Sequence, residues 1–367
     1  MNFGEAIDLC VRRNLSFAAW KSPTAGEAYL LISHKASTSL FDLQHTLLNQ
    51  RGFLFHPFST AEASPVFLRA DILFRESHGF EEGDFPAGRE VCGQEELFYQ
   101  ASQEEYETQV QAIVEQIRLG TLSKAVLSRV LLSPRPPSLA MGTLFQRMVH
   151  RYPGAFVYVV QTPTQLWCGA SPEPFLLADN GRYITTAIAG TRSSHASCQA
   201  LSDWSDKERR EQEFVSDHIS DCFGRHTAAP YEVVGPAPYV AGNLYHLKTT
   251  FSIAEQHLND RLASFIRDLH PTPAVCGLPT PKALSLLMAL EKHSRKYYAG
   301  FLGPVHIGTP LSLYVNLRCM QVMPRELALF MGAGIMADSL PRQEWNETVL
   351  KSETMMAIVR SFYEENP

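Results

Sequence analysis

The sequence predicts an α/β (α+β) protein in which mostly antiparallel sheets are surrounded by helices. Apolar segments of strand length recur along the chain, and amphipathic helices separate them without the regular strand–helix–strand alternation of a parallel sheet. The chain has 367 residues, of which 45% are hydrophobic and 19% charged. This length allows one large domain or two ordinary ones, and the composition is typical of a globular enzyme.

Composition also argues against several classes of partner. The net charge is −6 and no stretch is strongly basic, so we expect no nucleic-acid partner. The first residues are acidic, unlike a signal peptide, and no apolar run is long enough to span a bilayer. The seven cysteines are dispersed without a Cys-x-x-Cys pair, which is typical of reduced thiols. We therefore expect a cytoplasmic protein with no membrane partner.

Residues 1–95 form a variable N-terminal section without recognisable chemistry. Residues 28–32 and 52–55 are short strand candidates in polar, proline-containing surroundings. Residues 81–93 are rich in glycine, proline and acids, which indicates a boundary. We expect residues 1–95 to pack on the same core as a second section, residues 96–367, which carries the candidate site residues.

A helix and a strand open this second section. Ser102 begins a capping box, and the helix that follows ends near Gly120. The strand at residues 122–131 places Lys124 on the same face as Val126 and Ser128. A lysine in so apolar a strand either extends its ammonium outward to solvent or is desolvated and acts as a base.

Glu173 follows the next pair of strands, at residues 155–160 and 165–169. It lies between Pro172 and Pro174, which restrict its backbone. Taken alone, it is a glutamate in a surface turn. Residues 184–192 then form a strand that we expect to end in a Gly190–Thr191 turn.

Two helices each begin with a pair of acids above an apolar stripe. In the first, which starts at a capping box headed by Ser205, Glu208 and Glu211 share a face with Val215 and Ile219. In the second, Glu344 and Glu347 share a face with three core-type residues, Met355, Ile358 and Phe362. Either pair alone is explained by ion pairs or by the positive helix start. Two such helices favour a site for a hard cation, Mg²⁺ rather than zinc.

The C-terminal helix follows an apolar run at residues 327–331 and an expected Gly332-x-Gly334 turn. Asp338 and Ser339 are candidate caps, and Lys351 lies on the face of the two acids. Further strands are expected at residues 247–253 and, as one long strand holding Arg318, at residues 311–323, with a helix at residues 281–293. His270 precedes a proline-rich turn and is either a site residue or a structural histidine.

Together, these segments resemble the chorismate-utilising enzymes, the family of isochorismate, salicylate, anthranilate and aminodeoxychorismate synthases. Eight stretches match in family order over roughly the last two-thirds of the chain. They are Lys124–Arg129 (KAVLSR), Gly169–Glu173 (GASPE), Ile188–Arg192 (IAGTR), Lys207–Gln212 (KERREQ), His270–Gly277 (HPTPAVCG), Tyr298–Gly300 (YAG), Leu317–Arg318 and Gly332–Lys351.

The resemblance implies two stacked, mostly antiparallel sheets within a shell of helices, with chorismate and Mg²⁺ between them. The metal ligands would be Glu211 and Glu347, with Glu208 and Glu344 beside them through water. Tyr298 and Arg318 match residues that hold the pyruvyl carboxylate of chorismate. The other implied substrate contacts are Gly190, Thr191, His270, Leu317, Gly332, Gly334 and Lys351. Gln212 departs from the family pattern, because many relatives have histidine there.

The resemblance also implies isochorismate synthase activity, for menaquinone or siderophore synthesis. Family members that add water have lysine at the position of Lys124, with an acid matching Glu173. Lys124, neutral through desolvation, would activate a water for attack at C2, and a protonated Glu173 would protonate the departing C4 hydroxyl. Ala189 occupies the place of a lysine that is typical of aminodeoxychorismate synthases. We expect a monomer or homodimer without an obligatory glutaminase subunit.

Three alternatives remain open. A salicylate synthase would share the lysine and the acid and then eliminate pyruvate. An ammonia-dependent anthranilate or aminodeoxychorismate synthase subunit is less favoured, because it would need a glutamine amidotransferase partner. A non-catalytic chorismate-binding relative would be expected to have lost some of Lys124, Glu173, Glu211 and Glu347, and all four are present.

Overall fold

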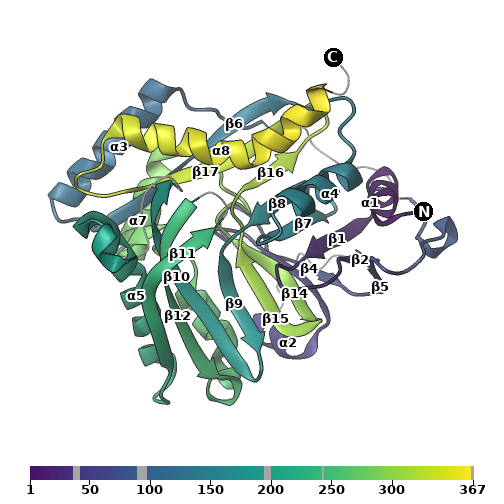
Figure 1. Ribbon diagram of the computed structural model, residues 1–367, viewed down its shortest axis with the longest axis horizontal. Coiled ribbons are helices and arrows are strands. Elements are labelled where there is room, and N and C mark those ends of the chain that lie inside the picture. Colours follow the sequence, from purple (N-terminus) through teal and green to yellow (C-terminus); the bar gives the residue numbers. More distant parts are fainter. Residues whose placement is uncertain (36–41, 89–96, 194–199, 242–243, 365–367) are drawn as a thin grey trace.

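Two antiparallel sheets, covered by helices, form the protein in the computed structural model (Figure 1). The structure describes residues 1–367 except 36–41, 89–96, 194–199, 242–243 and 365–367. Every strand pairing in the described residues is antiparallel, as the absence of regular strand–helix–strand units predicts. The expected fold class is thereby confirmed.

The larger sheet has nine strands. In spatial order they are β13 (Gly277–Leu278), β6 (Lys124–Pro134), β17 (Glu326–Ile335), β16 (Cys319–Val322), β8 (Leu166–Ser171), β7 (Phe156–Gln161), β1 (Ser16–Lys21), β2 (Tyr29–Ser33) and β5 (Ile72–Arg75). The second sheet has eight: β11 (Glu232–Ala241), β12 (Leu244–Ala254), β10 (Arg182–Ser193), β9 (Pro174–Asp179), β15 (Thr309–Val315), β14 (Phe301–Ile307), β3 (Gly52–His56) and β4 (Val66–Arg69).

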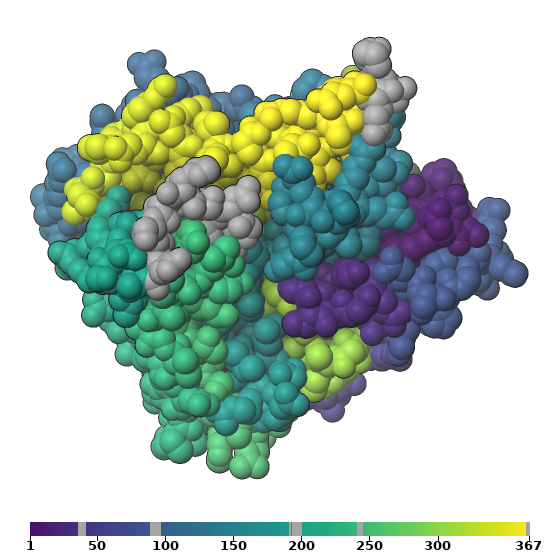
Figure 2. All heavy atoms as spheres, in the orientation of Figure 1, coloured from purple at the N-terminus to yellow at the C-terminus, as the bar shows by residue number. Residues whose placement is uncertain are grey.

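Helices cover the outer faces. They are α1 (Phe3–Arg12), α2 (Leu43–Asn49), α3 (Gln103–Arg118), α4 (Met141–Arg151), α5 (Asp206–His226), α6 (Leu262–Leu269), α7 (Thr280–Leu290) and α8 (Pro341–Glu364). Helix α5 packs on β10 and β12, whereas α8 packs on β17, α3 and α4 (Figure 1). In the space-filling view, α4 lies between α1 and α8 on the same face (Figure 2). None of the described helices combines the length and apolarity needed to span a bilayer.

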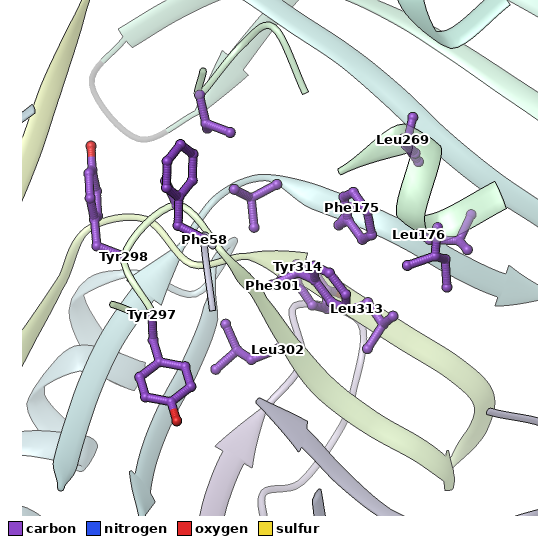
Figure 3. Packing of buried hydrophobic residues seen from close by; sticks show 14 of the residues in the cluster. Phe58, Phe175, Leu176, Leu269, Tyr297, Tyr298, Phe301, Leu302, Leu313 and Tyr314 are labelled. Carbon is purple, nitrogen blue, oxygen red and sulfur yellow. The ribbon is translucent and has the colours of Figure 1, made fainter. Parts of the chain in front are cut away.

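The main core fills the space between the two sheets. Alternation along the strands sends one set of side chains inward: Trp20 and Tyr158 pack there, whereas Ala19 and Val159 face α1 and α4 on the other side. Aromatic rings dominate this inter-sheet layer (Figure 3). For example, Phe175 of β9 stacks on Phe301 of β14 with ring centroids 4.6 Å apart.

The N-terminal section contributes to both sheets. Strands β1, β2 and β5 extend the nine-stranded sheet, and β3 and β4 lie at one edge of the eight-stranded sheet. Within the second sheet β3 pairs with β14, more than two hundred residues later in the chain. The described residues of this N-terminal section therefore share their sheets and their core with the rest of the chain.

Three local predictions were wrong. The single strand expected at residues 311–323 is two strands, β15 and β16, which lie in different sheets. Arg318 lies between them with a left-handed φ of 48°, so the chain changes sheets at this residue. The Gly332–Gly334 segment is no turn but the middle of β17, paired with Ser128 and Val126 of β6. Likewise β10 continues past Gly190 through a bulge, where Gly190 has φ 70°.

A substitution at Gly303 can test the close approach of β14 to β15. It has φ 152°, and a Cβ atom there would lie 1.9 Å from the carbonyl oxygen of Ser312. Gly303→Ala should lower the free energy of unfolding by more than the roughly 1–3 kcal/mol of backbone strain alone. Gly154→Ala is the control, since a Cβ at Gly154 has no neighbour within 4 Å. Equal urea midpoints for the two variants would show that this close approach is not real.

Candidate active site

A cavity of about 220 Å³ lies where both acid-bearing helices meet the two sheets. Its walls come from β6 and β17 of the larger sheet, β10 and β12 of the smaller sheet, and the first turns of α5 and α8. The lining includes all but two of the residues predicted for the site: Lys124, Glu173, Gly190, Glu208, Glu211, Tyr298, Leu317, Arg318, Gly332, Gly334, Glu344, Glu347 and Lys351. Residues spread over more than two hundred positions therefore share one cavity.

The two exceptions are Thr191 and His270. The side chain of Thr191 lies outside the described part of the chain. His270 does not line the cavity: its Nε2 lies 3.1 Å from the carbonyl oxygens of both Pro57 and Phe58. Burial, together with the nearby His56, lowers the pKa of His270 to about 3. His270 is therefore a neutral histidine that joins two chain segments, and the expected substrate contact is not found.

Lys124 is almost completely buried at the floor of the cavity. Only 1% of its side chain is exposed, and Nζ lies 2.8 Å from Oε1 of Glu211. It does not extend outward to solvent. Lys124 is therefore desolvated, as one of the two interpretations expects, and its amine nitrogen has a carboxylate as its direct neighbour. Glu211 thus connects the lysine of β6 to the first acid pair, on α5.

Glu173 lies beyond the end of β8 and is 8% exposed. Val315 N donates to its backbone carbonyl at 3.0 Å, which ties the Pro172–Pro174 segment to β15. Burial raises the pKa of Glu173 to about 7, although Lys124, Arg318 and Lys351 favour its carboxylate form. The surface-turn interpretation is therefore wrong: this is a buried carboxyl that titrates near neutral pH.

Each of the four helix acids has a basic neighbour in the structure. Glu211 has Lys124, Glu347 has Lys351 at 2.6 Å, and Glu344 has Lys207 at 3.7 Å. Glu208 accepts two hydrogen bonds from Arg192, at 2.7 and 2.6 Å, and completes the capping box with Ser205. Two of these cations, Lys124 and Arg192, lie on strands. The spacing of residues along the helices therefore could not reveal these pairs.

Glu344 and Glu347 nevertheless differ in their electrostatics. Burial raises the pKa of Glu344, and the charges of Glu347 and Glu211 raise it further. Burial also acts against the Glu347 carboxylate, but Lys351 outweighs it and the net pKa is lowered. Glu344 is therefore a buried carboxyl group that is repelled by Glu211 and Glu347 in the same cavity. Among the described residues, no three His, Cys, Asp or Glu side chains are grouped so that they could hold a metal ion as they stand. Each of these three acids lies against a lysine instead.

The cavity is also lined by basic and aromatic groups. Arg318, Lys351 and Tyr298 belong to the lining, and burial lowers the pKa of Arg318. Lys351, which is paired with Glu347, also donates to the carbonyl oxygen of Gly332 at 2.9 Å, and the two contacts fix the direction of its side chain. A buried guanidinium in a cavity wall is suited to binding a small carboxylate.

Two glycines of β17 make room for these groups. A Cβ at Gly334 would lie 2.8 Å from Oε1 of Glu211 and 3.3 Å from Cε of Lys124. A Cβ at Gly332 would lie 3.0 Å from the Tyr298 hydroxyl. These residues are glycine because side chains pass over the strand there. Both glycines line the cavity from a strand, and not from the turn expected at this place.

The sequence analysis missed His246 and Tyr239 in the cavity wall. Nδ1 of His246, on β12, lies 3.0 Å from the carbonyl oxygen of Gly190. Burial and the charge of Arg318 lower the pKa of His246 to about 4, so the ring is neutral. The sequence gives no sign of this, because His246 carries no motif and enters the site only through the pairing of β12 with β10.

Comparison with known proteins identifies the family to which this chain belongs. A profile described as "Chorismate binding enzyme" matches residues 81–360. The chain belongs to the chorismate-binding enzyme family. Vibriobactin-specific isochorismate synthase of Vibrio cholerae is 29% identical over 272 residues, which cover 71% of this chain and 68% of the relative. Anthranilate synthase component 1 of Bacillus pumilus is 27% identical, over 68% of this chain and 50% of the relative.

The fold of chorismate-binding enzymes is also found in the solved structures. The menaquinone-specific isochorismate synthase of Escherichia coli superposes with a TM-score of 0.79 at 20% identity. The match covers 96% of this chain and 91% of the other. It therefore includes most of residues 1–80, which precede the segment matched by the family profile.

The raised pKa of Glu173 predicts a pH-dependent stability. Between the unfolded value near 4.5 and the folded value near 7, the folded state binds the extra proton, so the parent loses stability as pH rises through this window. Glu173→Gln removes that loss. Its free energy of unfolding relative to the parent should rise between pH 5 and pH 8, by up to about 3 kcal/mol. A difference that does not vary with pH would contradict the raised pKa.

Proposed function

We propose that this chorismate-binding enzyme is a Mg²⁺-dependent isochorismate synthase. The observation that carries the proposal is that Lys124 of β6 and Glu173, between β8 and β9, line one cavity together with the helix acids. In the family resemblance, this lysine marks the members that add water, and the sequence similarity to an isochorismate synthase supports the same assignment. The product would serve menaquinone or siderophore synthesis.

The metal would be held by Glu211 and Glu347, with Glu344 beside them. These acids would first have to leave the lysines that they contact in this structure, where no three described acids are grouped to hold a metal ion. When bound, Mg²⁺ would supply positive charge for the ring carboxylate of chorismate. Glu208 would act mainly through Arg192, because the guanidinium and the helix cap occupy its oxygens. Arg318 and Tyr298 would hold the pyruvyl carboxylate in the cavity.

The two proton transfers follow from the environments of Lys124 and Glu173. Lys124 must leave its ion pair with Glu211 and lose its proton before it can accept one from water. That water then forms the new oxygen–carbon bond at C2, the ring double bonds shift, and the C4–oxygen bond breaks. Glu173, with its pKa near 7, is partly protonated at neutral pH and gives its proton to the departing hydroxyl. Water is consumed and released, so the reaction is an isomerisation.

The product assay tests this function directly. Purified protein incubated with chorismate and Mg²⁺ should yield isochorismate, identified by chromatography and mass, and excess chelator should abolish the activity. Salicylate as the main product would instead show a salicylate synthase. The similarity to an anthranilate synthase component makes ammonia the other alternative nucleophile. Anthranilate formed with ammonium salts, or full activity in chelator, would overturn the proposal.

Lys124 and Glu173 should be separable as base and acid. Lys124→Ala and Glu173→Gln should each lower kcat by at least about 10²-fold, with much smaller changes in substrate binding. The parent pH profile should be bell-shaped, and Glu173→Gln should lose the fall in rate at high pH that deprotonation of Glu173 causes. Near-parental turnover by Lys124→Ala would show that Lys124 only balances the charge of Glu211.

A further inference from the structure

Arg129 is a buried charge that the proposed chemistry does not use. It lies on β6 five residues after Lys124, so the two side chains leave opposite faces of the strand. Only 3% of Arg129 is exposed, and it does not line the cavity. No carboxylate forms an ion pair with it in the part of the chain that the structure describes. Burying a guanidinium without an ionic partner is costly, so its contacts require an explanation.

The contacts of Arg129 are with the first turns of α8. Its guanidinium carbon lies 4.1 Å from the centroid of the Trp345 ring, and Nε donates to Oγ1 of Thr348 at 2.7 Å. On the other side, Tyr106 of α3 meets the Trp345 ring edge-on at 5.7 Å. The Tyr106 hydroxyl in turn donates a hydrogen bond of 3.2 Å to the carbonyl oxygen of Leu127, which is also on β6. Trp345 is thus bounded by groups anchored on one strand.

These contact points flank the acids of α8. Trp345 directly follows Glu344, and Thr348 directly follows Glu347. Residues three apart lie on neighbouring turns of one helix face, so contacts at both limit rotation and sliding of the helix. A shift of the helix would move both carboxylates relative to the cavity. Arg129 can therefore affect the positions of the two carboxylates although it does not contact them.

We propose that Arg129 is a positioning residue that holds the first turns of α8 on β6, so that Glu344 and Glu347 face Lys124 across the cavity. Strand β6 would then set two parts of the site at once: Lys124 from its cavity face and the α8 acids through Arg129 on its other face. The consequence for metal binding rests on the proposed function, whereas the positioning itself does not.

The chain contains a matched control on the same helix. Arg147 of α4 lies 4.1 Å from the centroid of the Phe362 ring and donates to Oγ of Ser361 at 2.5 Å. This is the same combination of guanidinium, aromatic ring and hydroxyl, at the far end of α8 from the acids. Arg129→Lys and Arg147→Lys both keep the positive charge and remove the planar guanidinium. The two variants differ mainly in which end of α8 loses its contacts.

The test compares the two variants by amide hydrogen exchange and by calorimetric titration with MgCl₂ alone. Arg129→Lys should speed exchange in residues 341–351 and weaken Mg²⁺ binding by about 10- to 100-fold, the usual effect of losing a group that orients a ligand. Arg147→Lys should affect only the C-terminal turns and leave Mg²⁺ affinity at the parental value. Thr348→Ser, which retains the acceptor, should resemble the parent, and Thr348→Val should resemble Arg129→Lys.

The positioning role is refuted if Arg129→Lys leaves exchange in residues 341–351 unchanged, or if both lysine variants weaken Mg²⁺ binding equally. Failure of the proposed function gives a different result. A parent protein that makes no isochorismate, or binds no Mg²⁺, would still show faster exchange confined to residues 341–351 in Arg129→Lys. The exchange measurement therefore decides the positioning role independently of the reaction.

Discussion

The balance of buried charges around one cavity is the constraint on which the rest of this structure depends. Two helices carry acids toward the interior, and the cations that match them come from strands of both sheets and from the same two helices. In one of these pairs, Nζ of the buried Lys124 lies 2.8 Å from Oε1 of Glu211. An unmatched charge at this depth would be very costly, so the helices and sheets must meet in one arrangement. The same arrangement places a buried acid, Glu173, among three cations.

If the proposed function is correct, the charge balance would also allow one cavity to take up a metal ion and an anion. Each acid has a nearby cation, yet Glu344 remains repelled by Glu211 and Glu347, and its pKa is raised. A divalent cation would take over part of the role of the lysines, which would then be available to an anionic substrate. When a metal ion and an anionic substrate bind, the acids would exchange their lysine partners for the metal ion, and the lysines would pair with the substrate. No charge would then be buried without a partner.

Much of this could be predicted from the sequence because its signals are local. Helical spacing gave the shared face of Glu344 and Glu347, and the capping box at Ser205 predicted the start of α5. What failed depends on tertiary pairing. The Gly332–Gly334 segment resembles a turn locally, but β6 holds it as a strand and passing side chains require its glycines. His246 comes from β12 and the partner of Lys124, Glu211, comes from α5, so no pattern local to β6 or β10 reveals these contacts.

The central claim is that water adds to chorismate in a cavity set up by Lys124 and Glu173. The most direct measurement is the mass of the product formed in water enriched in the heavy oxygen isotope. The account predicts isochorismate that carries the heavy isotope in its C2 hydroxyl, because the oxygen bound at C2 comes from solvent and the C4 oxygen is lost. Unlabelled isochorismate would show that the hydroxyl moves within the substrate, and that Lys124 activates no water.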